Sequence, residues 1–197
     1  MDAKSKELFM QKDFQNMFQM IEYYAKKSPK HLSHIYKDHF DREVRVSYKN
    51  FYDSIVKTAS GLISLGMRTG SKAALISHTS YEWTLMDFSL MAIGAVSIPR
   101  GTDTPIQELS NIIDHSEPEY LIIETYNDLT RLVPSTKWKQ FKKIIILRRG
   151  IPYPKQKLIS LTDLYELGAA EFDKNKTTYD DLNKALSHDN LATIIYT

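Results

Sequence analysis

Cysteine is missing from the 197 residues of this chain. Its absence excludes disulfides, a catalytic thiolate and cysteine-ligated metal sites, and it agrees with a reducing compartment. Lys and Arg number 26 against 24 Asp and Glu, so the charge balance gives no reason to expect nucleic acid as a partner. No apolar run approaches the roughly 20 residues of a membrane span, and residues 1–12 lack the apolar core of a signal peptide. We therefore expect a cytoplasmic location, with any membrane contact peripheral and at the inner face.

Apolar runs without alternation recur along the chain and are separated by helical patterns. Strands buried on both faces have this composition, whereas half-exposed strands alternate apolar and polar residues. The pattern predicts an α/β fold: a mainly parallel sheet with helices on both faces, built from right-handed strand–helix–strand units. The expected strands are residues 72–77, 95–98 (stopped by Pro99), 120–123, 143–147 and 191–196.

Helical spacing and capping residues predict the connections. A helix over 6–25 and a short hairpin of 32–36 with 43–47 come first. Ser47 then caps a helix that stops at Gly66. Ser80 caps a second helix, over 81–93, and Thr104 a third, with Pro105 at its first position and Ile106 on its inner face. A helix or turn is expected around 127–133, and further helices are expected from Ser160 to Gly168 and from Thr178 over 182–186.

In open parallel sheets, ligands bind beyond the carboxyl ends of the strands. The candidate functional loops therefore follow Ser77, Ile98, Ile123, Leu147 and Thr197. Of the residues in these loops, Trp83 fits a core position better than a pocket wall. Glu82 suits the first turn of its helix, where a carboxylate meets free N–H groups. The basic residues Lys142, Lys143, Arg148 and Arg149, which bracket the expected strand 143–147, are interpreted as solvated charges at strand ends.

Two further patterns are weaker than they look. Residues 66–72 contain two glycines, Ser71 and Lys72, but their spacing and order fail the phosphate-loop pattern, and they lead into a strand. A helix stop and a turn explain them. His31, His34 and His39 have no ligand spacing that supports a metal site, so the sequence predicts neither catalytic nor metal-binding residues.

An ordered set of short motifs nevertheless resembles the start of the AMP-forming acyl-CoA synthetases, in particular the long-chain fatty acid–CoA ligases. No single motif is specific, but their order along most of the chain is. The last stretch is similar to the strand before that family's T-S-G-T-T-G-x-P-K-G loop, whose first residue Thr197 matches. The motifs are Val46-Ser47-Tyr48, Glu82-Trp83, residues 94–99, Thr104-Pro105 and residues 189–197.

The resemblance implies that residues 1–197 are the first part of a large N-terminal adenylate-forming domain, cut before its phosphate-binding loop and lacking the C-terminal domain. The parent would use ATP, Mg²⁺ and coenzyme A to convert a fatty acid into its CoA thioester through an acyl-adenylate. Thr197 is the single nucleotide-binding position carried over. The segment alone is expected to bind no cofactor, to be inactive and to self-associate in a non-native way.

The chain also departs from the family. Thr79-Ser80-Tyr81 replaces a frequent Asn-Arg-Pro, and residues 100–103 replace an aromatic stretch, so the roles of Arg100, Gly101, Thr102 and Asp103 stay unassigned. Two alternatives remain open at this point. One is an adenylating ligase for another carboxylate or an acyl carrier. The other is a non-catalytic α/β interaction module.

Overall fold

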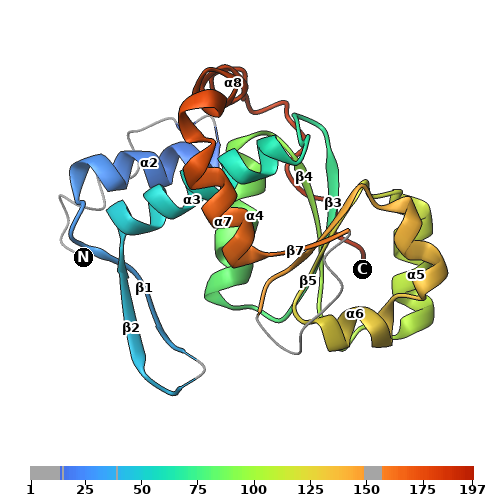
Figure 1. Cartoon of the computed structure of the whole chain (residues 1–197). Coiled ribbons are helices and arrows are strands. Elements are labelled where there is room, and N and C mark those ends of the chain that lie inside the picture. Colours follow the sequence, from blue (N-terminus) through green and yellow to red (C-terminus); the bar gives the residue numbers. More distant parts are fainter. Residues whose placement is uncertain (1–13, 15, 39, 149–156) are drawn as a thin grey trace.

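The computed structural model describes residues 14, 16–38, 40–148 and 157–197, and it has the predicted α/β architecture. Its centre is a five-stranded parallel sheet in the order β4-β3-β5-β6-β7, and a separate two-stranded antiparallel hairpin, β1–β2, lies to one side of it (Figure 1). The strands are β1 Leu32–Lys37, β2 Glu43–Ser47, β3 Lys72–Ile76, β4 Val96–Arg100, β5 Tyr120–Ile123, β6 Lys143–Ile146 and β7 Leu158–Ser160.

Helices cover both faces of the sheet. One layer is built on α3 and α4, joined by α2 and α7, and the other on α5 and α6 (Figure 1). The bounds are α2 Met17–Lys27, α3 Tyr48–Ser64, α4 Tyr81–Ala92, α5 Ile106–Ser116, α6 Tyr126–Leu132, the 3₁₀ helix η1 Ser135–Gln140, α7 Leu161–Ala170 and α8 Phe172–Lys184. The first part of the helix predicted over 6–25 lies outside the described residues.

Three predicted caps are present. The hydroxyls of Ser47, Ser80 and Ser160 each accept a hydrogen bond from the backbone N–H three residues on, at the starts of α3, α4 and α7. Such bonds satisfy N–H groups that the first helical turn leaves free. Gly66 has a φ of 91° and Gly70 a φ of 80°. These left-handed conformations suit glycine, and they confirm the helix stop and turn before β3.

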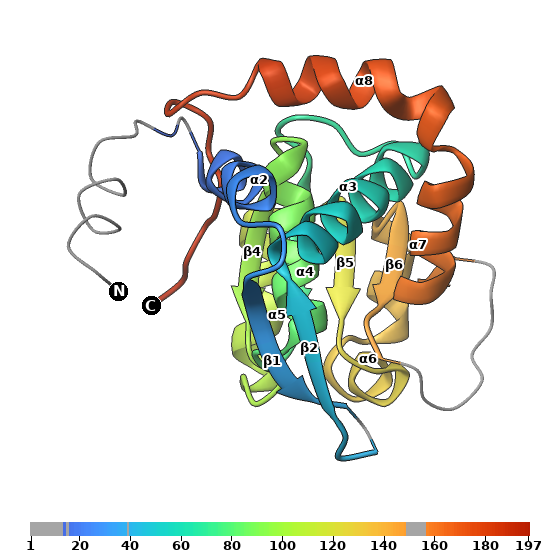
Figure 2. The ribbon, with the colours of Figure 1, turned by 90° about the vertical axis from the view of Figure 1, so that its left-hand side faces the viewer.

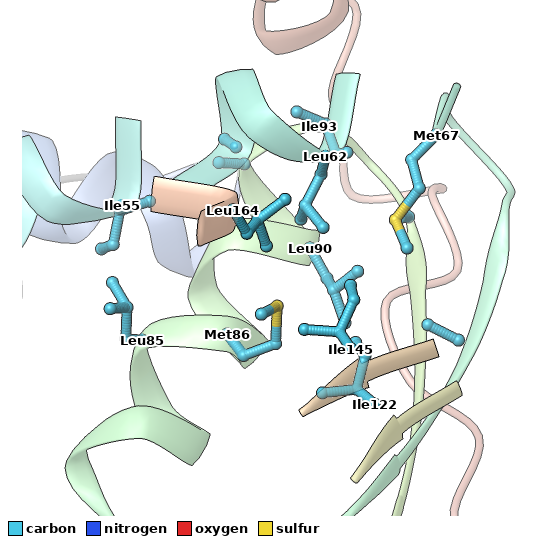
Figure 3. Close-up of a cluster of buried hydrophobic side chains, with 14 of the residues drawn as sticks. Ile55, Leu62, Met67, Leu85, Met86, Leu90, Ile93, Ile122, Ile145 and Leu164 are labelled. Carbon is cyan, nitrogen blue, oxygen red and sulfur yellow. The ribbon is translucent and has the colours of Figure 1, made fainter. Parts of the chain in front are cut away.

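Alternate strand residues separate the core into two clusters. Leu75, Ile122 and Ile145 face α3, α4 and α7, whereas Ile76, Ile123 and Ile146 face α5 and α6. Figure 3 shows the first cluster. This two-sided burial is the physical reason for the unbroken apolar runs. The labelled members are Ile55, Leu62, Met67, Leu85, Met86, Leu90, Ile93, Ile122, Ile145 and Leu164.

The chain reverses its direction across the sheet at β3. It leaves β3 through α4 to reach β4 on one side, and it returns through α5 to β5 on the other side of β3. The chain after β3 therefore leads to α4 on one face of the sheet, and the chain after β5 leads to α6 on the other face. The space between the carboxyl ends of β3 and β5 is a topological switch point, which is where ligands bind in open α/β sheets. The loops after Ile76 and Ile123 meet at this point.

The last segment differs from the prediction of a buried strand. Residues 191–197 run alongside β4 (Figure 2), but they form one isolated parallel bridge, between Thr193 and Ser97. Ser97 N–H donates to Ala192 O, and Ile194 N–H donates to Ser97 O. Pro99 has no N–H to continue this ladder. Pro99 itself lies inside β4 and does not stop it, because β3 pairs with β4 along its other side.

Three helix details also differ. The α5 helix begins at Ile106 after Pro105, with no side-chain cap, so Thr104 is not its N-cap. Ile106 is 50% exposed instead of facing inward. The α8 helix begins at Phe172, before the predicted start at Thr178, because Asn175 and Tyr179 form its buried face. Within the described part of the chain, no helix has the length and apolar character that crossing a membrane requires.

Candidate functional site

Polar side chains gather where the parallel strands end. Ser77 and His78 follow β3, Glu124 follows β5, Arg148 lies just beyond β6, and Arg100 ends β4. Because the strands are parallel, these five residues reach the same edge of the sheet from points far apart in the sequence. This carboxyl edge, defined by these residues, includes the switch point between β3 and β5.

Glu124 is the centre of the hydrogen bonds at the carboxyl edge, and it is only 7% exposed. Its Oε2 accepts from the backbone N–H of His78 at 2.9 Å and from the Ser77 hydroxyl at 3.3 Å, and it lies 3.0 Å from His78 Nδ1. Its Oε1 pairs with Arg148 Nη1 at 2.9 Å. A buried carboxylate needs such partners, and Glu124 thereby joins the ends of β3, β5 and β6.

The loop after β4 is attached to the same network. The Thr102 hydroxyl lies 2.8 Å from His78 Nδ1, and Thr102 O accepts from Arg131 Nη2 at 3.0 Å. Arg131 is held in turn by Asp128, 2.9 Å away within α6. Thr102 is therefore a buried link between the ends of β3 and β4 and helix α6, a role that sequence reasoning could not assign.

An open hollow of about 350 Å³ lies beside this network, between the ends of β3 and β4. Trp83 forms part of its wall and also packs against the core, so both of the positions considered for it from the sequence apply. An indole beside serine, histidine and arginine side chains offers both an apolar surface and hydrogen-bonding groups, as small-molecule sites do. The lining residues are Ser77, His78, Thr79, Trp83, Pro99, Arg100 and Gly101.

Two acidic residues of α4 have different surroundings. Glu82 lies in the first turn, as predicted, and its Oε2 is 4.0 Å from Arg148 Nε. Arg148 is therefore paired with two carboxylates, and the interpretation of it as a merely solvated charge was wrong. Asp87 is half-buried one turn further on. Burial raises the pKa of the Asp87 carboxyl, while the nearby Ser97 hydroxyl opposes that shift.

Thr197, the nucleotide-binding residue implied by the resemblance, is exposed next to a well-anchored residue. Tyr196 O accepts from Arg100 Nη1 at 2.9 Å, and Tyr196 OH lies 2.6 Å from His115 Nδ1. Arg100 also pairs with Glu108 in the first turn of α5. The structure thus places Arg100 in both the hollow and the support of the last segment, whereas the nucleotide role of Thr197 stays a prediction.

The sequence located the loops of this site but missed Glu124. The signal was present, since Glu124 directly follows the buried strand β5 and an acidic residue there must find partners. For Mg²⁺, the described residues contain no group of three or more His, Asp or Glu side chains arranged to hold a metal ion. They do not fit the ion by themselves, so no catalytic step through Mg²⁺ is assigned to this chain.

Solved structures show the same fold. The chain is similar to coronafacic acid ligase from Pectobacterium brasiliense, with a TM-score of 0.65 and 18% identity over 77% of this chain and 29% of that one. It is also similar to the N-terminal subdomain of NpsA from Klebsiella oxytoca, with a TM-score of 0.55 and 15% identity over 78% of this chain and 33% of that one.

Sequence comparison adds relatives. The chain is 26% identical over 166 residues to the chloroplastic long-chain-fatty-acid–[acyl-carrier-protein] ligase AEE15 of Arabidopsis thaliana, a match that covers 80% of this chain and 23% of that protein. It is 35% identical over 78 residues to the long-chain-fatty-acid–CoA ligase FadD15 of Mycobacterium tuberculosis, covering 40% of this chain and 13% of that protein. The model of the AMP-binding enzymes matches residues 21–197, and the chain belongs to this family of AMP-binding enzymes.

Proposed function

We propose that this chain is the N-terminal segment of an ATP-dependent long-chain fatty acid–CoA ligase. The fatty-acid carboxylate attacks the α-phosphate of ATP, pyrophosphate leaves, and the thiol of coenzyme A then displaces AMP from the acyl-adenylate. The observation that carries the proposal is the family match over residues 21–197. The names of the Arabidopsis and Mycobacterium relatives support the long-chain substrate.

The carboxyl edge suits a role as one wall of such a site. Adenylation brings two anions together, so it requires fixed hydrogen-bond donors and cations that need no rearrangement during the reaction. Arg148 is fixed at this edge by the buried carboxylate of Glu124. In this proposal the chain contributes Thr197 as a contact to the nucleotide, with the carboxyl edge as one wall of the site. The rest of the parent supplies the remaining contacts.

The test is carboxylate-dependent exchange of pyrophosphate into ATP by the full-length parent enzyme. Palmitate, butyrate, benzoate and alanine would be compared at equal concentration, with a reaction lacking carboxylate as the control. We expect palmitate to give the fastest exchange. A preference for butyrate, benzoate or alanine contradicts the long-chain substrate, and exchange with none of the acids favours a non-catalytic module.

Acyl carrier protein is a second candidate for the acceptor. The Arabidopsis relative whose match covers 80% of this chain is named as a ligase for acyl carrier protein, whereas the match to the CoA ligase covers 40%. Incubation of the parent with labelled palmitate and ATP, together with either coenzyme A or holo-acyl carrier protein, separates the two. Labelled acyl-CoA supports the first proposal, and label on the carrier protein supports the second.

A further inference from the structure

The segment before Thr197 is attached to the domain at three points. Thr193 forms the backbone bridge to Ser97. Tyr196 is held through its carbonyl by Arg100 and through its hydroxyl by His115. The segment is otherwise poorly covered, because Leu191 is 57% and Ile195 69% exposed. Its position therefore depends mainly on these few contacts, together with the edge contact between the Tyr196 and His115 rings.

Arg100 makes one of these contacts from the end of a paired strand. It follows Pro99 at the end of β4, a strand paired with β3 along its whole length. Its side chain is 23% exposed, and the guanidinium pairs with Glu108 through Nη2 while Nη1 donates to Tyr196 O. The planar guanidinium can serve two acceptors at fixed angles, which a lysine ammonium cannot do equally well. Glu108 thus orients Arg100 toward the backbone beside Thr197.

We propose that Arg100 is a positioning residue that fixes the backbone at Tyr196 and so presents Thr197 to the nucleotide. This inference rests on the proposed function, since it needs Thr197 to contact ATP. Arg100 acts through the carbonyl of its neighbour and not on the reacting atoms. Its loss should therefore weaken ATP binding more than it slows the chemical step.

The first test measures amide hydrogen exchange in the 197-residue chain, at a concentration at which light scattering shows a monomer. The N–H of Ile194 donates to Ser97 O, so its exchange reports whether the segment stays in place. We expect Arg100→Met to speed exchange at Ile194 about tenfold, the size expected for losing one hydrogen bond to a charged group. Arg100→Lys should show a smaller increase. Unchanged exchange at Ile194 in Arg100→Met overturns the inference.

Lys137→Met is the matched control. Lys137 also forms an ion pair with α5, to Asp114 at 2.5 Å. It belongs to η1, which precedes the amino end of β6, so it lies at the opposite edge of the sheet from Arg100. It should leave exchange at Ile194 unchanged. Glu108→Gln is a second, milder variant in case Arg100→Met fails to fold, because the Glu108 side chain is 46% exposed. It should speed exchange at Ile194 in the same direction.

The second test measures kinetics of the parent enzyme. Arg100→Met should raise the KM for ATP about tenfold, with kcat and the KM for the fatty acid within about twofold, and Arg100→Lys should restore part of the ATP affinity. A raised KM for ATP without faster exchange at Ile194 would mean that Arg100 contacts the nucleotide directly, which overturns the positioning role. An unchanged KM also overturns it. Failure of the proposed function looks different, since the wild-type parent would then show no carboxylate-dependent exchange.

Discussion

Two glutamates bracket β5 and differ in burial. Glu119 precedes the strand and pairs with Lys142, and this pair is partly in solvent, since the Lys142 side chain is 60% and the Glu119 side chain 35% exposed. Glu124 follows the strand, is almost fully buried, and serves the N–H of His78 as well as Arg148. An exposed pair is screened by water and contributes little to folding, whereas a buried carboxylate leaves several donors unpaired when it is lost.

Glu124→Gln should therefore lower the free energy of unfolding by about 1–3 kcal/mol. Its amide group cannot accept both from Arg148 and from the His78 N–H. Glu119→Gln is the matched control at the other end of the strand, and it should cost less than about 1 kcal/mol. Urea unfolding followed by circular dichroism measures both. Equal losses in the two variants would show that the burial of Glu124 does not matter.

At the level of elements, local signals predicted most of what the structure contains. Ser47, Ser80 and Ser160 cap helices because capping depends on a few adjacent residues. The errors arise where tertiary contacts decide. Thr178 lies inside α8 because the helix packs on α3 through Asn175, whose amide donates to Ser60 O. The three-residue strand β7 was missed because pairing with β6, and no local pattern, defines it.

The contact between α3 and α7 depends on two glycines. A Cβ at Gly168 would overlap the Lys57 carbonyl group and lie 2.6 Å from Gly61 N, and a Cβ at Gly61 would meet the Leu164 backbone. Gly168→Ala should therefore cost about 1–3 kcal/mol of stability through overpacking. Ala169→Ser, at the exposed neighbouring position, should stay within about 0.5 kcal/mol. Thermal unfolding compares them, and equal melting temperatures would contradict such close packing.

The hairpin is joined to the helices through a histidine. The His34 ring centroid lies 4.4 Å from that of Phe51 and 5.5 Å from that of Tyr81. Burial lowers the pKa of His34 from its ordinary value of 6.5. Between the lowered value and 6.5 the unfolded chain binds more protons than the folded one, so stability rises with pH across this window and is lost as pH falls.

His34→Gln should therefore flatten the dependence of unfolding free energy on pH below about 6.5. The substitution removes the group that binds the proton, although it also loses ring contacts and lowers stability at neutral pH. His31→Gln, at an exposed position before β1, should leave the slope as it is in the wild type. Denaturant unfolding at a series of pH values measures the slopes, and a wild-type slope in His34→Gln would contradict the effect of burial.

On the scale of the whole molecule, the site could be predicted only as a set of loops. Glu124 and His78 are 46 residues apart in sequence, and they meet because β3 and β5 are neighbours. Nothing local specifies that order, which results from the chain passing from β3 to β4 and back across to β5. Loop positions follow from strand positions, but contacts between loops follow from strand order.

The segment 191–197 has one side exposed to solvent. It lies at the edge of the sheet beside β4, with Leu191 and Ile195 largely exposed. Exposed apolar edges attract other chains, so we expect the 197-residue chain to self-associate as its concentration rises. Leu191→Lys with Ile195→Lys should reduce the average mass measured by light scattering. Ile106→Lys, an equally apolar and exposed position on α5, should not. If Ile106→Lys reduces the mass as much, then the attraction comes from general surface hydrophobicity and not from the edge of the sheet.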